Sequence, residues 1–419
     1  MVELAVEGLW SELGARGRQL LRFAAGGPLE IAAAPAGAAR VTGLFALPGF
    51  VNAHVHLDLS GIRGEELPHA SFAEWVEALV ARQRSQSPLE RAAAVRSGAI
   101  ELLGSGCVAV GDIDAHGGGL EALRDLPLEG VVHRELLGSP PAERLADLER
   151  QLAEQARALA AAVDPAGAAL PRLRSGLSPH APYSTSAALY EQLFALARRH
   201  DASVASHVAE SEEELVLLAE QRGPLWRLFE RMRFTPPSWP LAASGPLAAL
   251  DALSPPDGFV VIHGNRLNRT EIELCAKRRW PVVYCPRSHA YFGYAPHPAP
   301  ALLAAGGTVA LGTDSRASNS GLDLHAELAT WRRLDRSLPD AVLLTAATAA
   351  GRRALRLPRA ELVEGDPATF QLVRGRTAPL RSADELLPAA VRGELETVAV
   401  WIRGELAWSK ERGVITLRP

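Results

Sequence analysis

Eight short apolar segments between residues 50 and 314, separated by helix-like stretches, constrain the fold more than any other feature of the sequence. They span residues 50–57, 107–114, 130–137, 173–180, 203–207, 259–263, 281–285 and 308–314. Continuous apolar runs are typical of parallel strands that are buried on both faces, and the Ala-, Leu- and Arg-rich stretches between them predict crossover helices. We therefore predict an α/β fold, a (β/α)8 TIM barrel.

The two ends of the chain have a different pattern, in which short apolar runs are broken by glycine and proline. Neither end is long enough for a domain of its own, so we predict that they pair. The expected organisation is a small composite β-sandwich domain from residues 1–46 plus 360–419, and a barrel from 47–359. Residues 222–257, rich in proline, interrupt the alternation of the barrel and predict a lid-like insertion.

Composition narrows the class of protein. The formal net charge is −4 and 22% of residues are charged, which gives no electrostatic basis for binding nucleic acid or an anionic membrane. Cys107, Cys275 and Cys285 lack CxxC spacing, which argues against a disulfide framework or a cysteine zinc site. We find neither a signal-peptide pattern at the N-terminus nor a run of about 18 apolar residues. We therefore predict a cytoplasmic protein without nucleic-acid or membrane partners.

Polar residues occur at the ends of five of the eight predicted strands. They are His54, His56, His180, His207, His263 and Asp314. Because catalytic groups of a (β/α)8 barrel lie at the C-terminal ends of its strands, these side chains are expected to converge. His54 and His56 point to the same side of one strand and can chelate a divalent ion. A single histidine is usually structural, and Asp314 alone could cap a helix, but all six together predict a metal-dependent site.

Five motifs carry a family resemblance. They read Pro-Gly-Phe-Val-Asn-Ala-His54-Val-His56, Ser-Pro-His180-Ala-Pro-Tyr-Ser, Ser-His207-Val-Ala-Glu210-Ser, Ile-His263-Gly and Leu-Gly-Thr-Asp314-Ser-Arg-Ala-Ser-Asn. In this order they resemble the amidohydrolase superfamily, in the branch of cytosine deaminases, triazine hydrolases and S-adenosylhomocysteine deaminases. The resemblance covers essentially the whole chain and implies the barrel fold with metal-dependent hydrolysis.

The resemblance also implies roles for individual residues. The implied metal ligands are His54, His56, His207 and Asp314. Asp314 would also accept the proton of the attacking water, His263 would hold that water, and His180 would contact the substrate. Glu210 would be the proton shuttle, although glutamates follow it at 212–214 and it could be a solvated residue at a helix start.

The lysine content bears on the number of metal ions. Binuclear branches of the superfamily use a carboxylated lysine on the fourth strand to bridge two ions. The only lysines here are Lys277, after the sixth strand, and Lys410, in the tail. We therefore predict one divalent ion, and three imidazoles with a carboxylate favour Zn²⁺, with Fe²⁺ as the alternative.

Candidate substrate contacts come from several segments. They are His180, Arg134, Arg144, Arg287, His289, Trp75 and Ser315. Arg134 and Arg144 are similar in placement to arginines that bind a substrate carboxylate in the S-adenosylhomocysteine-deaminase-like group, although Arg144 could equally be a surface residue. At the seventh strand, His289 stands where the family usually has asparagine, and Arg287 adds a cation. Trp75 could stack on a ring or simply pack.

The seventh-strand pattern is similar to that of aminodeoxyfutalosine-deaminase-like members of the branch, whose substrate is an adenine nucleoside carrying a benzoate. The leading hypothesis is a mononuclear aminohydrolase that deaminates such a carboxylate-bearing nucleoside. Guanine or cytosine deamination, triazine or chloro-heteroaromatic hydrolysis and lactam opening use the same ligands and stay open, as does a non-catalytic barrel scaffold. The expected partner is a small molecule, and because family members are often dimers, a homodimer is a further expectation.

Overall fold

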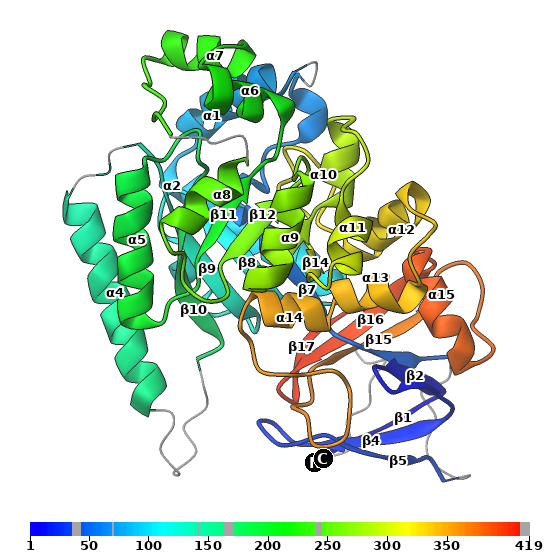
Figure 1. The fold of residues 1–419 in the computed structure, drawn as a ribbon. Helices are drawn as coiled ribbons and strands as arrows, with labels where there is room; N and C mark the ends of the chain where they lie inside the picture. The colour runs from blue at the N-terminus through cyan, green and yellow to red at the C-terminus, as the bar shows by residue number, and fades with distance from the viewer. Residues whose placement is uncertain are drawn as a thin grey trace.

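The computed structural model describes residues 1–35, 43–68, 71–138, 140, 142–161, 171–239 and 245–410. Its centre is a ring of parallel strands surrounded by helices, and β-sheets built from the two ends of the chain lie at one side of that ring (Figure 1). Within the described ranges, no helix combines the length and the apolar composition needed to cross a membrane.

Eight parallel strands form the barrel. They are β7 (Phe50–Val55), β8 (Cys107–Asp114), β9 (Glu129–Leu136), β10 (Leu173–Pro179), β11 (Ala205–Val208), β12 (Val260–His263), β13 (Val282–Tyr284) and β14 (Val309–Leu311). They pair in the orders β10-β9-β8-β7 and β11-β12-β13-β14. A parallel bridge between Leu177 and Val204 joins β10 to β11. The carbonyl of His54 accepts the N–H groups of Thr313 and Asp314, which closes the ring between β7 and the end of β14. The predicted (β/α)8 barrel is confirmed.

Helices follow the strands and cover the outside of the barrel (Figure 1). They are α1 (Phe72–Ser85), α2 (Pro88–Gly104), α3 (Gly119–Leu123), α4 (Ala142–Ala161), α5 (Ala187–His200), α6 (Glu212–Glu220), α7 (Pro224–Met232), α8 (Pro246–Ala252), α9 (Arg269–Arg278), α10 (Pro286–Tyr291), α11 (Ala299–Ala304), α12 (Leu324–Leu334), α13 (Asp340–Ala346) and α14 (Ala349–Ala354). Local sequence sets several starts, since Ser87 with Glu90 and Asn268 with Glu271 form capping boxes at α2 and α9.

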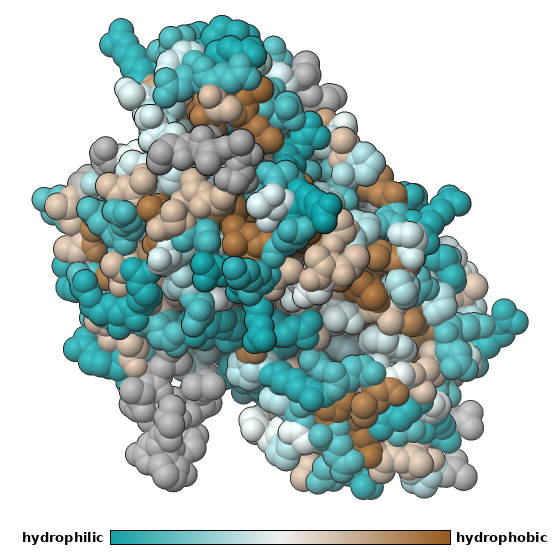
Figure 2. All heavy atoms as spheres, in the orientation of Figure 1, coloured by the Kyte–Doolittle hydropathy of each residue, from teal (hydrophilic) through white to brown (hydrophobic). Residues whose placement is uncertain are grey.

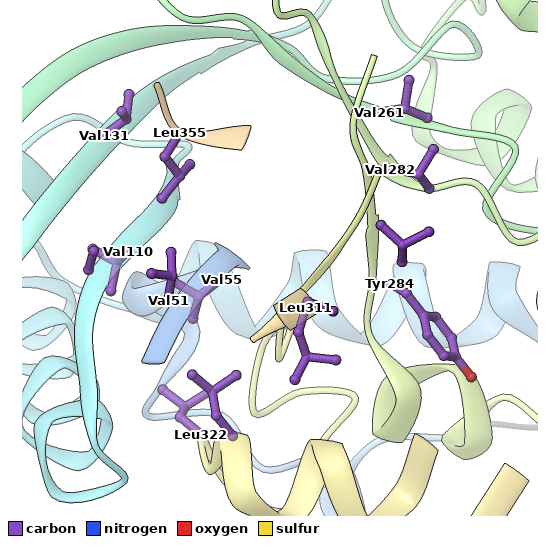
Figure 3. Close-up of a cluster of buried hydrophobic side chains, with 14 of the residues drawn as sticks. Val51, Val55, Val110, Val131, Val261, Val282, Tyr284, Leu311, Leu322 and Leu355 are labelled. Atoms are coloured by element: carbon purple, nitrogen blue, oxygen red, sulfur yellow. The ribbon is translucent and has the colours of Figure 1, made fainter. Parts of the chain in front are cut away.

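Side-chain alternation along the strands separates two layers of core. Val261 and Val282 belong to the large cluster between strands and helices, together with Val131, Tyr284 and other side chains shown in Figure 3. Residues of the opposite parity, such as Ile262 on β12, form a second cluster of mostly small side chains. Fully burying a Val, Leu or Ile side chain contributes about 1.5–3 kcal/mol to the stability of the fold. Because successive side chains of a strand point to opposite faces, these two layers fix which residues of each strand face into the barrel.

Both ends of the chain contribute to the terminal β-structure. A six-stranded sheet has the order β17 (Glu405–Ser409), β16 (Leu395–Ile402), β15 (Phe370–Gly375), β6 (Phe45–Pro48), β2 (Gly8–Ser11) and β3 (Gly14–Arg16). A second sheet contains β1 (Val2–Val6), β4 (Gln19–Phe23) and β5 (Glu30–Ala33), and the short helix α15 (Leu386–Val391) precedes β16. Antiparallel pairing of β6 with β15 joins the two ends, as expected. The rings of Phe23, Phe370 and Trp401 pack in its core, Phe370 stacking on Trp401 with centroids 5.3 Å apart. The residue limits of the two domains stay predictions.

The predicted insertion contains α7 and α8, and its residues 240–244 lie outside the described part of the chain. Leu225, Leu228 and Phe229 of α7 are buried. The guanidinium of Arg231 forms an ion pair with Glu77 of α1, with Nη2 and Oε2 2.7 Å apart. Figure 1 shows α1, α6 and α7 together above the barrel. In Figure 2 the outer surface of this region is mainly hydrophilic, and hydrophobic surface lies just below it. The insertion therefore covers one end of the barrel; its movement as a lid stays a prediction.

Candidate active site

The ends of β7, β11 and β14 bring the four predicted metal ligands together. The Nε2 atoms of His56 and His207 are 3.3 Å apart. The Oδ1 atom of Asp314 lies 3.6 Å from Nε2 of His54 and 3.9 Å from Nε2 of His56. These residues come from three strands that are far apart in sequence, so the cluster is a product of the barrel and not of any local motif.

Two residues of the site have a backbone conformation that is uncommon for side chains other than glycine. The φ angles are 65° at His263 and 57° at Asp314, both in the left-handed region. Such a conformation costs on the order of 1–3 kcal/mol and persists only where the surroundings impose it. At Asp314 the N–H donates to the carbonyl of His54, which turns the end of β14 toward β7. The barrel therefore maintains a locally strained geometry at this cluster.

Hydrogen bonds orient the imidazole of His207. Its Nδ1 atom lies 3.1 Å from the carbonyl oxygen of His180, and a carbonyl only accepts, so Nδ1 carries the proton. The Nε2 atom of His207 therefore presents a lone pair to the cluster, which is the arrangement that a metal ligand requires.

The carboxylate of Asp314 is fixed in a similar way. Its Oδ2 atom accepts hydrogen bonds from the hydroxyls of Ser288 and Ser318, each 2.8 Å long, and its Oδ1 atom accepts the N–H of Ser315 at 2.7 Å. Burial opposes its ionisation, but the neighbouring imidazoles of His54, His263 and His56 outweigh burial and hold the Asp314 pKa well below its ordinary value. Asp314 is therefore an anion at neutral pH.

The donor set fits a divalent ion. Both ring nitrogens of His54 are buried and have no hydrogen-bond partner among the described residues, which is costly unless a metal or another group engages them. Burial and then His54 lower the pKa of His56 to about 3, so its imidazole is neutral. Ligand atoms of His54, His56 and Asp314 lie within 4.8 Å of one another. Three imidazoles and a carboxylate are a zinc-type ligand set.

Glu210 and His263 lie beside the ligands. Nε2 of His263 is 3.5 Å from Oε1 of Glu210, and these two residues and Asp314 form a further compact group. Burial, followed by the charges of Asp314 and Glu214, raises the pKa of Glu210 well above its ordinary value. The raised pKa favours the protonated form of the Glu210 carboxyl, which is the form that can donate a proton.

The backbone of Glu210 is held by residues that sequence analysis did not single out. The carboxylate of Glu214 accepts the N–H groups of Ala209 and Glu210 at 3.0 and 2.7 Å. The amide of Asn265 donates to the carbonyl of Glu210 at 2.9 Å. Sequence analysis had grouped Glu214 with solvated glutamates at a helix start, whereas this side chain is fully buried. Its spacing of four residues from Glu210 was the signal available in the sequence.

The cluster forms the floor of a cavity of about 190 Å³. Three of the predicted substrate contacts, His180, Trp75 and Ser315, line this cavity. The rest of its wall is mainly apolar and comes from α1, α7 and neighbouring loops. The apolar lining residues of α1 and α7 are Phe72, Trp75, Val76, Leu79, Val80, Phe229 and Met232. The arrangement suits a flat, largely apolar molecule whose reacting atom lies over the histidines.

A family model described as the amidohydrolase family matches residues 45–407. The chain belongs to the amidohydrolase family. The aminodeoxyfutalosine deaminase of Deinococcus radiodurans is 32% identical over 343 residues, covering 79% of this chain and 78% of that protein. A 5-methylthioadenosine/S-adenosylhomocysteine deaminase of Thermococcus kodakarensis is 27% identical over 358 residues, covering 83% of this chain and 78% of that protein.

Solved structures agree on the fold of this amidohydrolase. The crystal structure of an adenosine deaminase from Xanthomonas campestris with bound zinc matches with a TM-score of 0.78 at 22% identity, and the match covers 99% of this chain and 94% of that chain. At this identity the match establishes the barrel fold and its terminal β-structure alone.

Two of the predicted substrate contacts of this amidohydrolase lie elsewhere. Arg134 and Arg144 line a separate cleft of about 870 Å³ between β8–β10 and the helices α3 and α4. Nη1 of Arg134 is 3.3 Å from Oδ1 of Asp114, and Arg144 donates to the carbonyl oxygens of Ala115 and Glu135. The reason is strand parity: Arg134 points out of the barrel, whereas the next residue, Glu135, points in. The two arginines therefore lie outside the histidine pocket, and their contact with a substrate carboxylate stays a prediction.

Arg287 and His289 are also absent from the residues that line the pocket. The guanidinium of Arg287 donates to the carbonyl of Gly321 at 3.0 Å and to the hydroxyl of Ser320. His289 is buried, and its Nδ1 lies 3.2 Å from Oδ1 of Asn265, the residue that holds the Glu210 backbone. His289 therefore supports the site from outside the pocket, and the contact of His289 and Arg287 with substrate stays a prediction.

Glu135 is a pocket residue that sequence analysis missed. It lines the cavity, and its carboxyl lies in a compact group with ring nitrogens of His180 and His207. Burial, followed by the charges of Asp58 and Asp114, raises its pKa to about 8. The signal in the sequence was its position at the end of the predicted third strand, two residues after His133.

Proposed function

We propose that this amidohydrolase is a mononuclear zinc-dependent aminohydrolase that deaminates an adenine-type nucleoside. The proposal rests mainly on the position of the Glu210 carboxyl, which is buried 3.5 Å from His263 and grouped with Asp314, and whose pKa is raised by that burial. A proton donor next to a carboxylate base and a metal-type ligand set suits hydrolytic replacement of a ring amino group. The D. radiodurans and T. kodakarensis relatives, both deaminases by name, support this reaction class.

His54, His56, His207 and Asp314 would hold the ion. A divalent ion bound there supplies a water whose pKa is lowered from 15.7 toward about 7. Zinc is favoured by the ligand chemistry and by the zinc bound to the X. campestris deaminase. A single ion is favoured because Lys277 lies in α9 and Lys410 follows β17, so neither lysine can act as a bridging ligand from β10.

The protein side chains handle the protons. The carboxyl of Glu210 donates to the ring nitrogen beside the amino-bearing carbon, which makes that carbon electrophilic. The carboxylate of Asp314 accepts a proton from the attacking water, and the imidazole of His263 orients that water. The water oxygen adds to that carbon, which becomes tetrahedral, and the C–N bond then breaks. The amino group leaves as ammonia with the proton that Asp314 took from water, and the remaining proton of the water returns to Glu210 as the C=O bond forms. Glu210 and Asp314 have pKa values shifted in opposite directions, as donor and acceptor roles require.

Two substrates compete within this class. Aminodeoxyfutalosine is favoured by the D. radiodurans relative, and its aromatic substituent suits the wall formed by Phe72, Trp75 and Phe229. 5′-Methylthioadenosine is favoured by a different observation: no lysine or arginine occurs among the described residues that line the pocket, so nothing there pairs with a carboxylate. A methylthio group would pack on the same apolar wall without needing a cation.

The test is a panel of aminodeoxyfutalosine, 5′-methylthioadenosine, S-adenosylhomocysteine, adenosine, guanine, cytosine and a chlorotriazine with the zinc-loaded protein. The expected result is ammonia release with loss of adenine absorbance for at least one adenine nucleoside. Turnover of guanine, cytosine or the chlorotriazine with none of the nucleosides would contradict the proposal, chloride release marking triazine hydrolysis. Less than half an equivalent of metal in freshly purified protein would favour a non-catalytic scaffold.

A further inference from the structure

The carboxyl of Glu135 has no role in the proposed proton transfers, although it lies in the same pocket. The residue is only 6% exposed, and its Oε1 atom is buried without a hydrogen-bond partner among the described residues. It lies at the end of β9, and its carboxyl and ring nitrogens of His180 and His207 are all within 4.8 Å of one another. A buried carboxyl oxygen without a partner in a ligand cavity is costly unless the ligand engages it.

A second metal ion is not the partner that this cluster fits. Nδ1 of His207 donates to the carbonyl of His180, and its Nε2 faces Nε2 of His56 at 3.3 Å. Both nitrogens of His207 are therefore already used, which leaves His180 and Glu135 with too few ligands for an ion.

Which ring nitrogen of His180 donates and which accepts a hydrogen bond further restricts the kind of ligand that this part of the pocket can bind. The hydroxyl of Ser184 donates to the carbonyl of Ala181 at 3.2 Å, so it accepts from Nδ1 of His180 at 2.5 Å. Nε2 of His180 then has no proton and is an acceptor. The pocket floor therefore presents an imidazole acceptor next to a carboxyl, and together they require a group that can donate.

A neutral group fits better than a cation, because the divalent ion of the proposed site would repel a positive charge held nearby. A hydroxyl both donates and accepts, so it pairs with the carboxyl of Glu135 in either protonation state. Two neighbouring hydroxyls would satisfy Glu135 and Nε2 of His180 together. The vicinal hydroxyls of a ribose have this chemistry.

We propose that Glu135, beside His180, is the sugar-recognition residue of this pocket and selects nucleosides with free ribose hydroxyls over their deoxy forms. The inference rests on the proposed function and adds a specificity determinant to it. Since a hydrogen bond to a buried charged or polar group changes binding by about ten- to a hundred-fold, the preference should be measurable.

The experiment compares the best nucleoside substrate of the panel with its 2′,3′-dideoxy form, in wild type, Glu135→Ala, Glu135→Gln and the control Glu191→Gln, an exposed glutamate on α5. Wild type and control should prefer the hydroxylated nucleoside in kcat/KM by about tenfold or more. In Glu135→Ala the preference should fall below about threefold, mainly through a higher KM for the hydroxylated substrate. In Glu135→Gln, which preserves volume if the alanine variant fails to fold, the preference should fall at least about threefold.

Each other result overturns the inference. An equal preference in wild type and in the folded variants, or an equal loss of both substrates, removes Glu135 from sugar recognition. Loss of zinc from the Glu135 variants, measured by elemental analysis, would make Glu135 a metal ligand instead. If wild type deaminates no adenine nucleoside, the proposed function is refuted. If it deaminates the hydroxylated and dideoxy nucleosides equally well, only the role of Glu135 in sugar recognition is refuted.

Discussion

Replacing Glu210 by glutamine tests the proposed mechanism most directly. Glutamine keeps the shape of the side chain, and the backbone of residue 210 stays held by Glu214 and Asn265, so the variant should fold and retain its metal ligands. What it loses is the acidic proton next to His263. A positioned general acid typically accelerates a reaction by roughly 10²- to 10⁴-fold. We therefore expect kcat/KM to fall by that factor, which is equivalent to a loss of about 3–5 kcal/mol of transition-state stabilisation.

The pH profile gives a second, independent readout. Burial raises the Glu210 pKa, and only the protonated form donates, so wild-type kcat/KM should fall as the pH rises through that raised pKa. The alkaline fall due to Glu210 should be absent in Glu210→Gln. Ammonia release measures the rate, elemental analysis measures the metal, and Glu212→Gln is the control, since Glu212 is exposed and pairs with Arg266. If Glu210→Gln with one equivalent of metal retained more than about a tenth of wild-type kcat/KM, Glu210 would not be the proton donor.

Three further predictions concern the residues around this centre. His207→Ala should contain less than half an equivalent of zinc by elemental analysis, because it removes an oriented ligand nitrogen; full occupancy would exclude His207 as a ligand. Glu214→Gln leaves a buried N–H of Ala209 or Glu210 unpaired, so urea denaturation should show a loss of about 1–3 kcal/mol in the free energy of unfolding. The variant should also have a lower kcat. Unchanged stability together with unchanged kcat would contradict the positioning role of Glu214. Arg287→Ala should keep KM for every nucleoside within about twofold of the wild-type value, because the guanidinium contacts Gly321 and Ser320 outside the pocket. A large rise in KM would show that Arg287 contributes to substrate binding.

Much of the architecture could be predicted from the sequence. All eight predicted strands occur, because each is a continuous apolar run long enough to cross a barrel. The convergence of His54, His207 and Asp314 followed from one rule, that barrel strands end on the same side. The same rule does not say which face of a strand each residue occupies. Arg134 and Glu135 are adjacent and both polar, and only the packing of β9 against its neighbours decides that Glu135 enters the pocket.

Long-range support of the site was also beyond the sequence. His289 contacts Asn265, which in turn donates to the backbone carbonyl of Glu210. These three residues follow β13, β12 and β11, respectively, and their spacing in the sequence does not reveal the connection. Glu214 has the composition of a solvated helix start, since Glu212 and Glu213 precede it, and only the fold shows that it turns inward.

The pairing of β6 with β15 has a consequence for the order of events during biosynthesis. The side-chain amide of Gln371 donates to the carbonyl of Pro48, 323 positions earlier in the chain. At roughly 5–20 residues per second, a ribosome needs on the order of 15–65 s to make the intervening chain. During that interval the barrel strands emerge while one edge of β6 lacks its partner, and unpaired strand edges are sites of aggregation. We expect the sheet to be completed last, so the nascent chain depends on chaperones until β15 and β16 emerge from the ribosome.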